Sequence, residues 1–433
     1  MIAHQCEMLH LESEVPSNCG AKASENICVL LVGNYIHDRQ QSMQRFVRVL
    51  ASEIRARGIG VIELTPMPIF GQLKPSASGI GKWLGYIDKF VLFPRLLRKR
   101  THDAIKRSRN AGSRFVAHIC DHSSAFYTHS LTGIPHLLTC HDMLAIRSGL
   151  GKISQNPTRC SGRILQRAIL GGLNCAQQVA CISEATRRDV IAFSRVPSEA
   201  THVVHMGFND PFSPMAGQAA RRLVLELTRG ASSSHLNVCD GPYLLHVGGN
   251  QWYKNRIGVL KMFEAVCTLF DAEHHAPKLR LIMVGPPAIA SMRDWFDRHP
   301  EINKRVHLIE GVSNEQLQAL YSAAECLLFP SLEEGFGWPI VEAHACGCRV
   351  IATNKAPMTE VGGEAVVYLA PEIIAPKRDE IGFTKAASII KDVLREDQGK
   401  RMERVRNGLE NAKRFSTQDM ISKYVALYNK IAR

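Results

Sequence analysis

The sequence predicts an α/β protein of two doubly wound, Rossmann-like domains that face a central cleft. Short apolar runs recur along the chain between segments of helix length, and the series starts again after a proline-containing break near residue 213. Continuous apolar runs are typical of strands buried on both faces of a parallel sheet that is flanked by helices. At 433 residues the chain is also longer than one hydrophobic core usually organises.

The two series of apolar runs divide the chain into domains. Residues 1–24 are polar and are expected to form a flexible tail, residues 25–213 the N-terminal domain and residues 214–414 the C-terminal domain. The expected strands of the first series are 27–32, 60–64, 115–119, 136–139, 178–182 and 202–205, and those of the second are 243–247, 279–284, 306–309, 326–329 and 349–352. Residues 209–213, which include Pro211, are the expected linker. Ligands of open parallel sheets bind beyond the carboxyl ends of the strands, so we expect the site in the cleft.

Composition narrows the class of protein and its location. An apolar fraction of 45% and a charged fraction of 21% are those of an ordinary globular protein. Thirteen irregularly spaced cysteines favour a reducing compartment, and the first residues lack a signal-peptide pattern. No run of 18 uncharged apolar residues occurs, which argues against an ordinary transmembrane helix. We therefore expect a cytoplasmic protein, either soluble or peripheral on a membrane.

Positive charge is concentrated in the first half of the chain. Residues 1–214 hold 25 Lys and Arg against 15 Asp and Glu, whereas the remainder holds 28 against 25. The segment 82–100 mixes aromatic, aliphatic and basic residues, and Arg107, Arg109 and Arg114 extend its charge. It is either a domain helix that packs on the sheet or an interfacial helix that faces an anionic membrane or a lipid-linked acceptor. No recognisable module supports nucleic-acid binding.

The most informative stretch runs from Phe329 to Gly347. A buried strand ends at Phe329, a glycine-containing loop follows, and a helix begins near Pro339. Gly335, Phe336 and Gly337 would place backbone amides at a helix N-terminus, which suits diphosphate oxygens or sugar hydroxyls.

Two carboxylates, Glu334 and Glu342, bracket this loop with seven residues between them. Carboxylates only accept hydrogen bonds, so they suit pairs of sugar or ribose hydroxyls. Alternatively, the stretch is an ordinary strand-loop-helix connection that binds no ligand, and its acidic residues only favour the helix N-terminus.

This stretch resembles the signature of the retaining glycosyltransferases of family 4, which have the GT-B fold, and the resemblance covers about residues 25–433. The glutamate-x7-glutamate pattern matches Glu334 and Glu342, with the glycine-phenylalanine-glycine and the proline in place. The resemblance implies that Glu334 contacts the donor sugar and stabilises positive charge at its anomeric carbon, while Glu342 binds the ribose. It also implies that residues 415–433 form a helix that crosses back to the N-terminal domain.

A second match lies in the loop after the first strand of the second domain. The family places a lysine there on the donor diphosphate, and Lys254 fits that position. Tyr253 stands where the family commonly has arginine, so Arg256 is a candidate for the missing part of the phosphate clamp. The other donor-side candidates are glycine-loop residues that an ordinary turn explains almost as well: Gly249, Gly285, Gly311 and Val312.

The first domain supplies the remaining candidates. His141 follows a strand where the family often has a histidine that reaches the donor sugar, and we treat it with Glu334 as catalytic. Asp121 and His122 could line the acceptor pocket, and Gly33 could approach a phosphate. A metal site is not expected, because no second half of a structural site is evident and the aspartate-x-aspartate motif is absent.

The expected reaction moves a sugar from a nucleoside diphosphate-sugar to a hydroxyl of a saccharide or lipid-linked saccharide. No cofactor is expected, since the nucleotide-sugar is a substrate. Two alternatives are a nucleotide-sugar epimerase of the same architecture and a non-catalytic nucleotide-sugar-binding subunit. A nicotinamide dehydrogenase is disfavoured, because no glycine-x-glycine-x-x-glycine fingerprint is complete.

Overall fold

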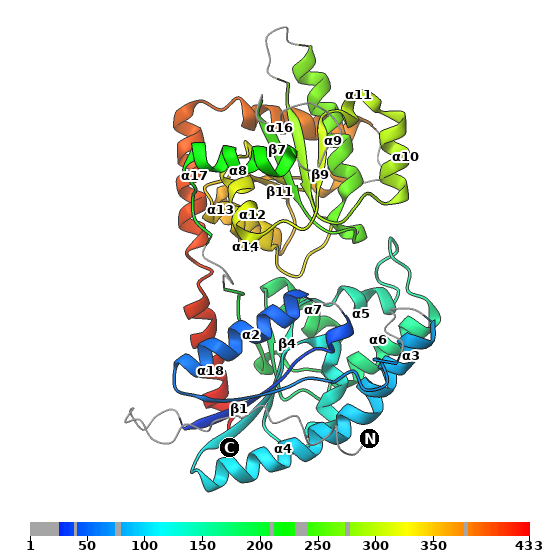
Figure 1. The fold of residues 1–433 in the computed structure, drawn as a ribbon, viewed down its shortest axis with the longest axis vertical. Coiled ribbons are helices and arrows are strands. Elements are labelled where there is room, and N and C mark those ends of the chain that lie inside the picture. The colour runs from blue at the N-terminus through cyan, green and yellow to red at the C-terminus, as the bar shows by residue number, and fades with distance from the viewer. Residues whose placement is uncertain are drawn as a thin grey trace.

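The protein folds into two α/β units stacked along its long axis (Figure 1). The structure, a computed structural model, describes residues 26–38, 41–73, 79–207, 212–229, 241–272, 278–375 and 380–433. The expected tail 1–24 and residues 209–211 of the expected linker lie outside these ranges. Within them, no helix is long and apolar enough to cross a membrane.

The first unit is a six-stranded parallel sheet in the order β2-β1-β3-β4-β5-β6. Its strands are β1 (Ile27–Val32), β2 (Gly60–Leu64), β3 (Arg114–Ile119), β4 (His136–Cys140), β5 (Gln178–Cys181) and β6 (Thr201–Val203). Its helices are α2 (Gln41–Ala56), α3 (Gly79–Ile87), α4 (Phe93–Asn110), α5 (Leu144–Gly149), α6 (Cys160–Leu173) and α7 (Glu184–Phe193). All six strands were predicted, and only β6 differs by more than one residue at an end.

The second unit repeats the plan in the order β12-β11-β10-β7-β8-β9. Its strands are β7 (Tyr243–Val247), β8 (Arg280–Val284), β9 (Val306–Ile309), β10 (Cys326–Phe329), β11 (Val350–Thr353) and β12 (Val366–Leu369). Its helices are α8 (Gly217–Arg229), α9 (Arg256–Asp271), α10 (Ala290–Arg298), α11 (Pro300–Asn303), α12 (Asn314–Ala323), α13 (Trp338–Ala345), α14 (Met358–Gly362), α15 (Pro371–Ile374), α16 (Glu380–Leu394) and α17 (Gln398–Ala412). The last helix, α18 (Thr417–Ile431), lies against the first unit. The edge strand β12, whose two middle residues are partly buried, was not among the predicted strands.

Strand order locates the ligand crevice of the second sheet. The chain runs outward from β7 through β8 to β9 and then returns to β10, which pairs with the other side of β7. Such a reversal of strand order opens a crevice beyond the carboxyl ends of the two strands. The loops that follow β7 and β10 therefore border the expected binding site.

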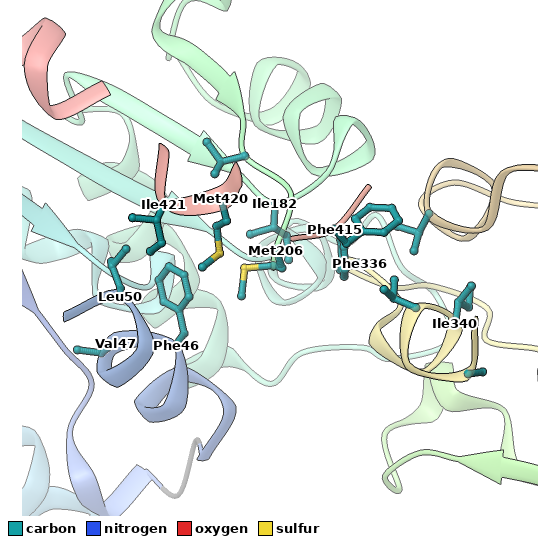
Figure 2. Packing of buried hydrophobic residues seen from close by; sticks show 14 of the residues in the cluster. Phe46, Val47, Leu50, Ile182, Met206, Phe336, Ile340, Phe415, Met420 and Ile421 are labelled. Atoms are coloured by element: carbon teal, nitrogen blue, oxygen red, sulfur yellow. The ribbon is translucent and has the colours of Figure 1, made fainter. Parts of the chain in front are cut away.

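One buried apolar cluster joins the two units. It extends from Phe46 and Leu50 of α2 through Met206 and Phe415 to Phe336, which precedes α13 (Figure 2). The connection from α17 to α18 carries the chain back down the side of the first unit (Figure 1).

Helix α18 contacts α2 and β1 and is fixed by a buried chain of hydrogen bonds. The hydroxyl of Tyr428 lies 2.7 Å from Nδ1 of His118, whose Nε2 lies 2.8 Å from the hydroxyl of Thr139. That hydroxyl in turn lies 2.9 Å from the hydroxyl of Tyr424. Burial lowers the pKa of His118 to about 3, so this ring is neutral near pH 7.

Replacing Tyr428 by phenylalanine is expected to destabilise the fold by roughly 1–3 kcal/mol, because a buried nitrogen of His118 loses its partner. Urea denaturation measures the change. Lys423→Ala, at an exposed position of the same helix, is the control and should change stability by less than about 0.5 kcal/mol. Equal effects of the two substitutions would mean that the hydrogen-bond chain contributes nothing specific.

Candidate active site between the two units

An ion pair lies in the crevice between β7 and β10. Nζ of Lys254 is 2.6 Å from Oε1 of Glu334, and their side chains are only 15% and 8% exposed. The amide of Leu332 donates to the carbonyl of Tyr253 at 2.7 Å, which fixes the two loops against each other. Because the pair is largely shielded from water, its attraction is stronger than that of a surface pair. The structure thus brings together two of the predicted site residues.

Glu342 lies on α13 and faces both α12 and the first unit. The hydroxyl of Tyr321 donates to its Oε2 at 2.9 Å. Burial raises the pKa of Glu342, while this hydrogen bond and the positive charge of Arg45 on α2 act in the opposite direction. Neither Tyr321 nor Arg45 was predicted, since nothing in their local sequence pattern indicates a ligand site.

The loop between the two glutamates takes its shape from its glycines and one buried ring. Gly337 precedes α13 with φ of 108°, a conformation that side chains other than that of glycine rarely adopt. Phe336 is buried, with its ring centroid 5.5 Å from that of Phe415 and 5.3 Å from that of Trp338. The anchored ring holds the loop at the start of the helix.

Gly335 is the point at which this loop touches the first unit. A Cβ atom added there would lie 2.2 Å from the carbonyl oxygen of His141. The carbonyl of Gly335 accepts hydrogen bonds from the hydroxyls of Ser183 at 2.8 Å and Thr186 at 3.3 Å. Only a residue without a side chain allows so close an approach. The loop after β10 therefore docks on the carboxyl ends of β4 and β5.

His141 lies at this contact and is 6% exposed. Its Nε2 is 2.9 Å from the carbonyl oxygen of Cys120, and its ring meets that of Phe46 edge to face at 5.2 Å. Burial lowers the pKa of His141, so the ring is neutral near pH 7.

Asp121 and His122 lie beneath the surface, 2% and 8% exposed. The side-chain amide of Asn34 donates to Asp121 at 2.5 Å, and Nδ1 of His122 lies 3.2 Å from the same carboxylate. Although burial opposes it, the contact with His122 and a hydrogen bond from Ser123 hold the pKa of Asp121 well below its usual range. The two residues thus form a hydrogen-bonded group beneath the loop that follows β1. Gly33 begins that loop, and a Cβ there would lie 2.8 Å from Cγ2 of Thr65.

Arg256 is turned into the protein. One guanidinium nitrogen donates to the carbonyl of Pro286 at 2.8 Å and to the side chain of Asn250, and the residue is 5% exposed. The guanidinium therefore links the loops that follow β7 and β8.

The predicted glycines of the donor side have different surroundings. A Cβ on Gly285 would lie 2.2 Å from the carbonyl oxygen of Gly248, so close packing of two loops requires glycine there. A Cβ on Gly249 would lie 2.3 Å from Oε1 of Gln251. Gly311 has φ of 68° with open space beside it, and Val312 packs partly buried against the joining cluster.

A cavity of about 250 Å³ opens between the units beside Glu334. It is lined by Asp142, Met143, Leu144, Arg147, Ala185, Thr186, Arg188, Asp189, Glu333, Glu334, Lys355 and Ala356. Nη1 of Arg147 lies 3.1 Å from Asp189 and 3.4 Å from Glu333, and Nζ of Lys355 lies 2.5 Å from the same glutamate. Of these residues only Glu334 was predicted from the sequence, because the others come from separate parts of the chain, including helices α5 and α7.

A carboxylate of the second unit caps a helix of the first. Glu360 on α14 accepts hydrogen bonds from the backbone amides of Glu184 at 2.7 Å and Ala185 at 3.3 Å, at the start of α7. Nε2 of His205 lies 2.7 Å from the same carboxylate. Although burial opposes it, these contacts lower the pKa of Glu360.

Among the residues that the structure describes, no three His, Cys, Asp or Glu side chains gather in a way that could hold a metal ion.

Comparisons with known proteins agree with this architecture. Over 94% of the chain, the structure matches sucrose-phosphate synthase from Thermosynechococcus elongatus with a TM-score of 0.63 at 20% identity, covering 99% of that chain. It also matches Anabaena Alr3699/HepE, solved in complex with UDP and glucose, with a TM-score of 0.62 at 15% identity over 93% of this chain and 99% of that one. The fold is GT-B, as predicted.

Two family models assign the chain to a family. Residues 43–210 match the model described as Glycosyltransferase Family 4, and residues 232–405 match that described as Glycosyl transferases group 1. O-antigen chain mannosyltransferase B of Escherichia coli is 24% identical over 273 residues, which are 61% of this chain and 64% of that protein. Matches to the first three curated relatives span 54 to 66% of their lengths. The chain belongs to glycosyltransferase family 4.

Gly335→Ala is expected to push the loop after β10 away from His141, because the new methyl group would overlap its carbonyl oxygen. A displacement of about 1 Å costs up to about 100-fold in rate at a positioned site. We therefore expect the radius of gyration in small-angle scattering to rise and turnover to fall. Gly171→Ala, where a methyl group meets open space, is the control. An unchanged scattering curve together with full turnover would contradict the contact.

Glu360→Gln is expected to lower the free energy of unfolding by roughly 1–3 kcal/mol near pH 7, because charged hydrogen bonds to α7 are lost. Since contacts lower the carboxyl pKa in the folded state, its contribution is full above the ordinary value of 4.5. This contribution to stability disappears as the pH falls through the lowered pKa of Glu360 in the folded state. The gap between variant and wild type in urea titrations should therefore close at acidic pH; a gap that does not change with pH would argue against this role.

Proposed function

We propose that the protein is a retaining glycosyltransferase that moves a hexose from a nucleoside diphosphate-sugar to a hydroxyl of a saccharide or lipid-linked saccharide, without a metal ion. The observation that carries the proposal is the shielded pair of Lys254 and Glu334 at the crevice of the second sheet. Family membership and a neighbour solved with UDP support a nucleoside diphosphate donor.

The donor is proposed to lie along the crevice from Glu342 to Glu334. Glu342 would accept hydrogen bonds from the ribose, with Tyr321 holding its carboxylate in place. Lys254 would meet the diphosphate, and the loop of Gly335, Phe336 and Gly337 would offer backbone amides to the phosphate or the sugar.

The other donor-side residues are proposed to act through the loops that they shape. Arg256 would contribute positive charge and hold the loop after β7 through Asn250, without direct contact. Gly249 and Gly285 would let that loop and its neighbour pack closely, and Gly311 with Val312 would border the base. Gly33 would allow the loop after β1 to approach the phosphates.

Charge at the anomeric carbon is proposed to be stabilised by Glu334. As the bond to the diphosphate breaks, the sugar becomes positive, and a fixed carboxylate nearby lowers the energy of that state. The neutral ring of His141 would orient a sugar hydroxyl at the contact of the two units.

The acceptor is proposed to enter the cavity beside Glu334. Its charged lining from both units offers many donors and acceptors for hydroxyl groups. The sequence suggested that Asp121 and His122 line the acceptor pocket. Because both side chains are buried, we propose instead that they hold Asn34 and the loop after β1 in place. A lining made by both units would exclude water only when they are in contact.

A screen of nucleoside diphosphates by thermal unfolding tests the donor site, since a ligand of the native state raises the melting temperature. Glu342→Ala is expected to weaken affinity at least about 10-fold, because charged hydrogen bonds to the ribose are lost. Glu334→Gln should keep the nucleotide shift and lose transfer by about 100-fold or more.

Glu372→Ala removes an exposed carboxylate of the same unit and is the matched control. An unchanged shift in Glu342→Ala would remove that residue from the ribose site. Epimerised nucleotide-sugar formed without an acceptor would contradict the proposed reaction.

A further inference from the structure

Exposed apolar side chains concentrate on one part of the first unit. Among the described residues, fifteen large hydrophobic side chains are exposed, and eight of them lie between positions 67 and 96. The eight are Met67, Ile69, Phe70, Leu73, Trp83, Ile87, Val91 and Leu96, with Leu73 76% and Trp83 68% exposed. A contiguous apolar surface on a monomer commonly marks a binding site.

Four of these residues, Trp83, Ile87, Val91 and Leu96, lie on one continuous helical segment, or rod. Helices α3 and α4 are joined through a π-helical turn, η2 (Asp88–Leu92), whose flanking residues keep helical dihedral angles. Trp83, Ile87 and Val91 follow one another at intervals of four, the spacing that places side chains on one face of a helix. Buried Phe93 and Leu97 mark the opposite face of α4, which packs on the sheet.

A buried carboxylate fastens the other exposed residues to this rod. Asp88, 1% exposed, accepts hydrogen bonds from the amides of Phe70 at 3.0 Å and Gly71 at 2.9 Å. It also accepts one from the hydroxyl of Tyr35 at 2.9 Å. The loop 67–73 is thereby held beside α3, and both are tied to the loop that leaves β1 toward the cleft.

Positive charge continues from the apolar residues along α4. Residues 82–114 contain ten Lys and Arg against two Asp, and one of those two, Asp88, is buried. The exposed cations of α4 are Arg95, Arg98, Lys99, Arg100, Lys106, Arg107 and Arg109. Figure 1 shows α4 along the end of the first unit farthest from the second unit.

We propose that this surface, made of loop 67–73 and the α3–η2–α4 rod, docks on an anionic lipid bilayer. The apolar side chains, with Trp83 among them, would enter the headgroup region, and the cations of α4 would lie against the lipid phosphates. Charge complementarity favours a bilayer as the partner. The exposed apolar side chains are followed along α4 by a row of cations, and an anionic bilayer offers both an apolar interior and a negative surface. Through Asp88 and Tyr35, the docked surface adjoins the loop after β1.

One part of this inference rests on the proposed function: that docking brings the cleft close to a lipid-linked acceptor. Docking itself needs neither donor nor turnover. A vesicle assay can therefore fail or succeed independently of the nucleotide screen.

Co-sedimentation of the full chain with vesicles of equal parts phosphatidylglycerol and phosphatidylcholine tests the proposal, with pure phosphatidylcholine as comparison. The triple variant Arg98→Glu, Lys99→Glu, Arg100→Glu is expected to weaken binding to the anionic vesicles by about 100-fold. The matched control reverses three exposed cations elsewhere, Lys400→Glu, Arg406→Glu and Lys423→Glu, and changes net charge equally. The control should bind within about 3-fold of wild type.

A second measurement follows the apolar part of the surface. Brominated lipids are expected to quench the emission of wild-type protein but not of Trp83→Phe, which should still bind. Trp83→Ser with Val91→Ser should weaken binding at least about 10-fold. The nucleotide-induced thermal shift, measured with uridine and guanosine diphosphate, should be the same in all variants.

Several outcomes would overturn the proposal. These are no binding of wild type to anionic vesicles, equal binding to pure phosphatidylcholine, and equal losses in the triple variant and its control. Binding of duplex DNA or self-association that depends on the same cations, without vesicle binding, would assign the surface to another partner.

Discussion

The arrangement of the two units depends on one contact, in which the loop after β10 packs on the carboxyl ends of β4 and β5. Gly335 lies so close to the backbone of His141 that no side chain fits between them, and its carbonyl is held by Ser183 and Thr186. This contact sets the position of Glu334, the residue directly before Gly335 in the same loop. The cavity beside Glu334 is lined by residues of both units, so it forms only when this contact is made.

Charged residues divide between two tasks in the cleft. Glu360 and Arg147 connect the units, one by capping α7 and the other by reaching acidic side chains on both sides. Lys254 and Glu334 instead pair within the second unit at the crevice where strand order reverses. The pair neutralises both charges and, with the hydrogen bond from Leu332 to Tyr253, holds the loops after β7 and β10 together.

The outer surface and the cleft are linked by a short path of buried groups. Asp88 holds the loop 67–73 and Tyr35, and Tyr35 belongs to the loop that leaves β1. Asn34, the residue before Tyr35, is held by Asp121. The proposed lipid-facing side of the first unit and the proposed substrate-facing side are therefore both anchored to the end of β1.

The sequence alone determined the two sheets and the central motif, because both leave local patterns. Strands buried on both faces read as apolar runs, which gave eleven of the twelve strands. The spacing of Glu334 and Glu342 around a glycine loop indicated the candidate site. The edge strand β12 was not predicted, although residues 365–370 form the same kind of apolar run. Tertiary structure alone decided the partners of these residues. Tyr321, Arg147 and Glu360 meet the site only through chain reversals that no local pattern records, and the inward turn of Arg256 depends on carbonyls from a neighbouring loop.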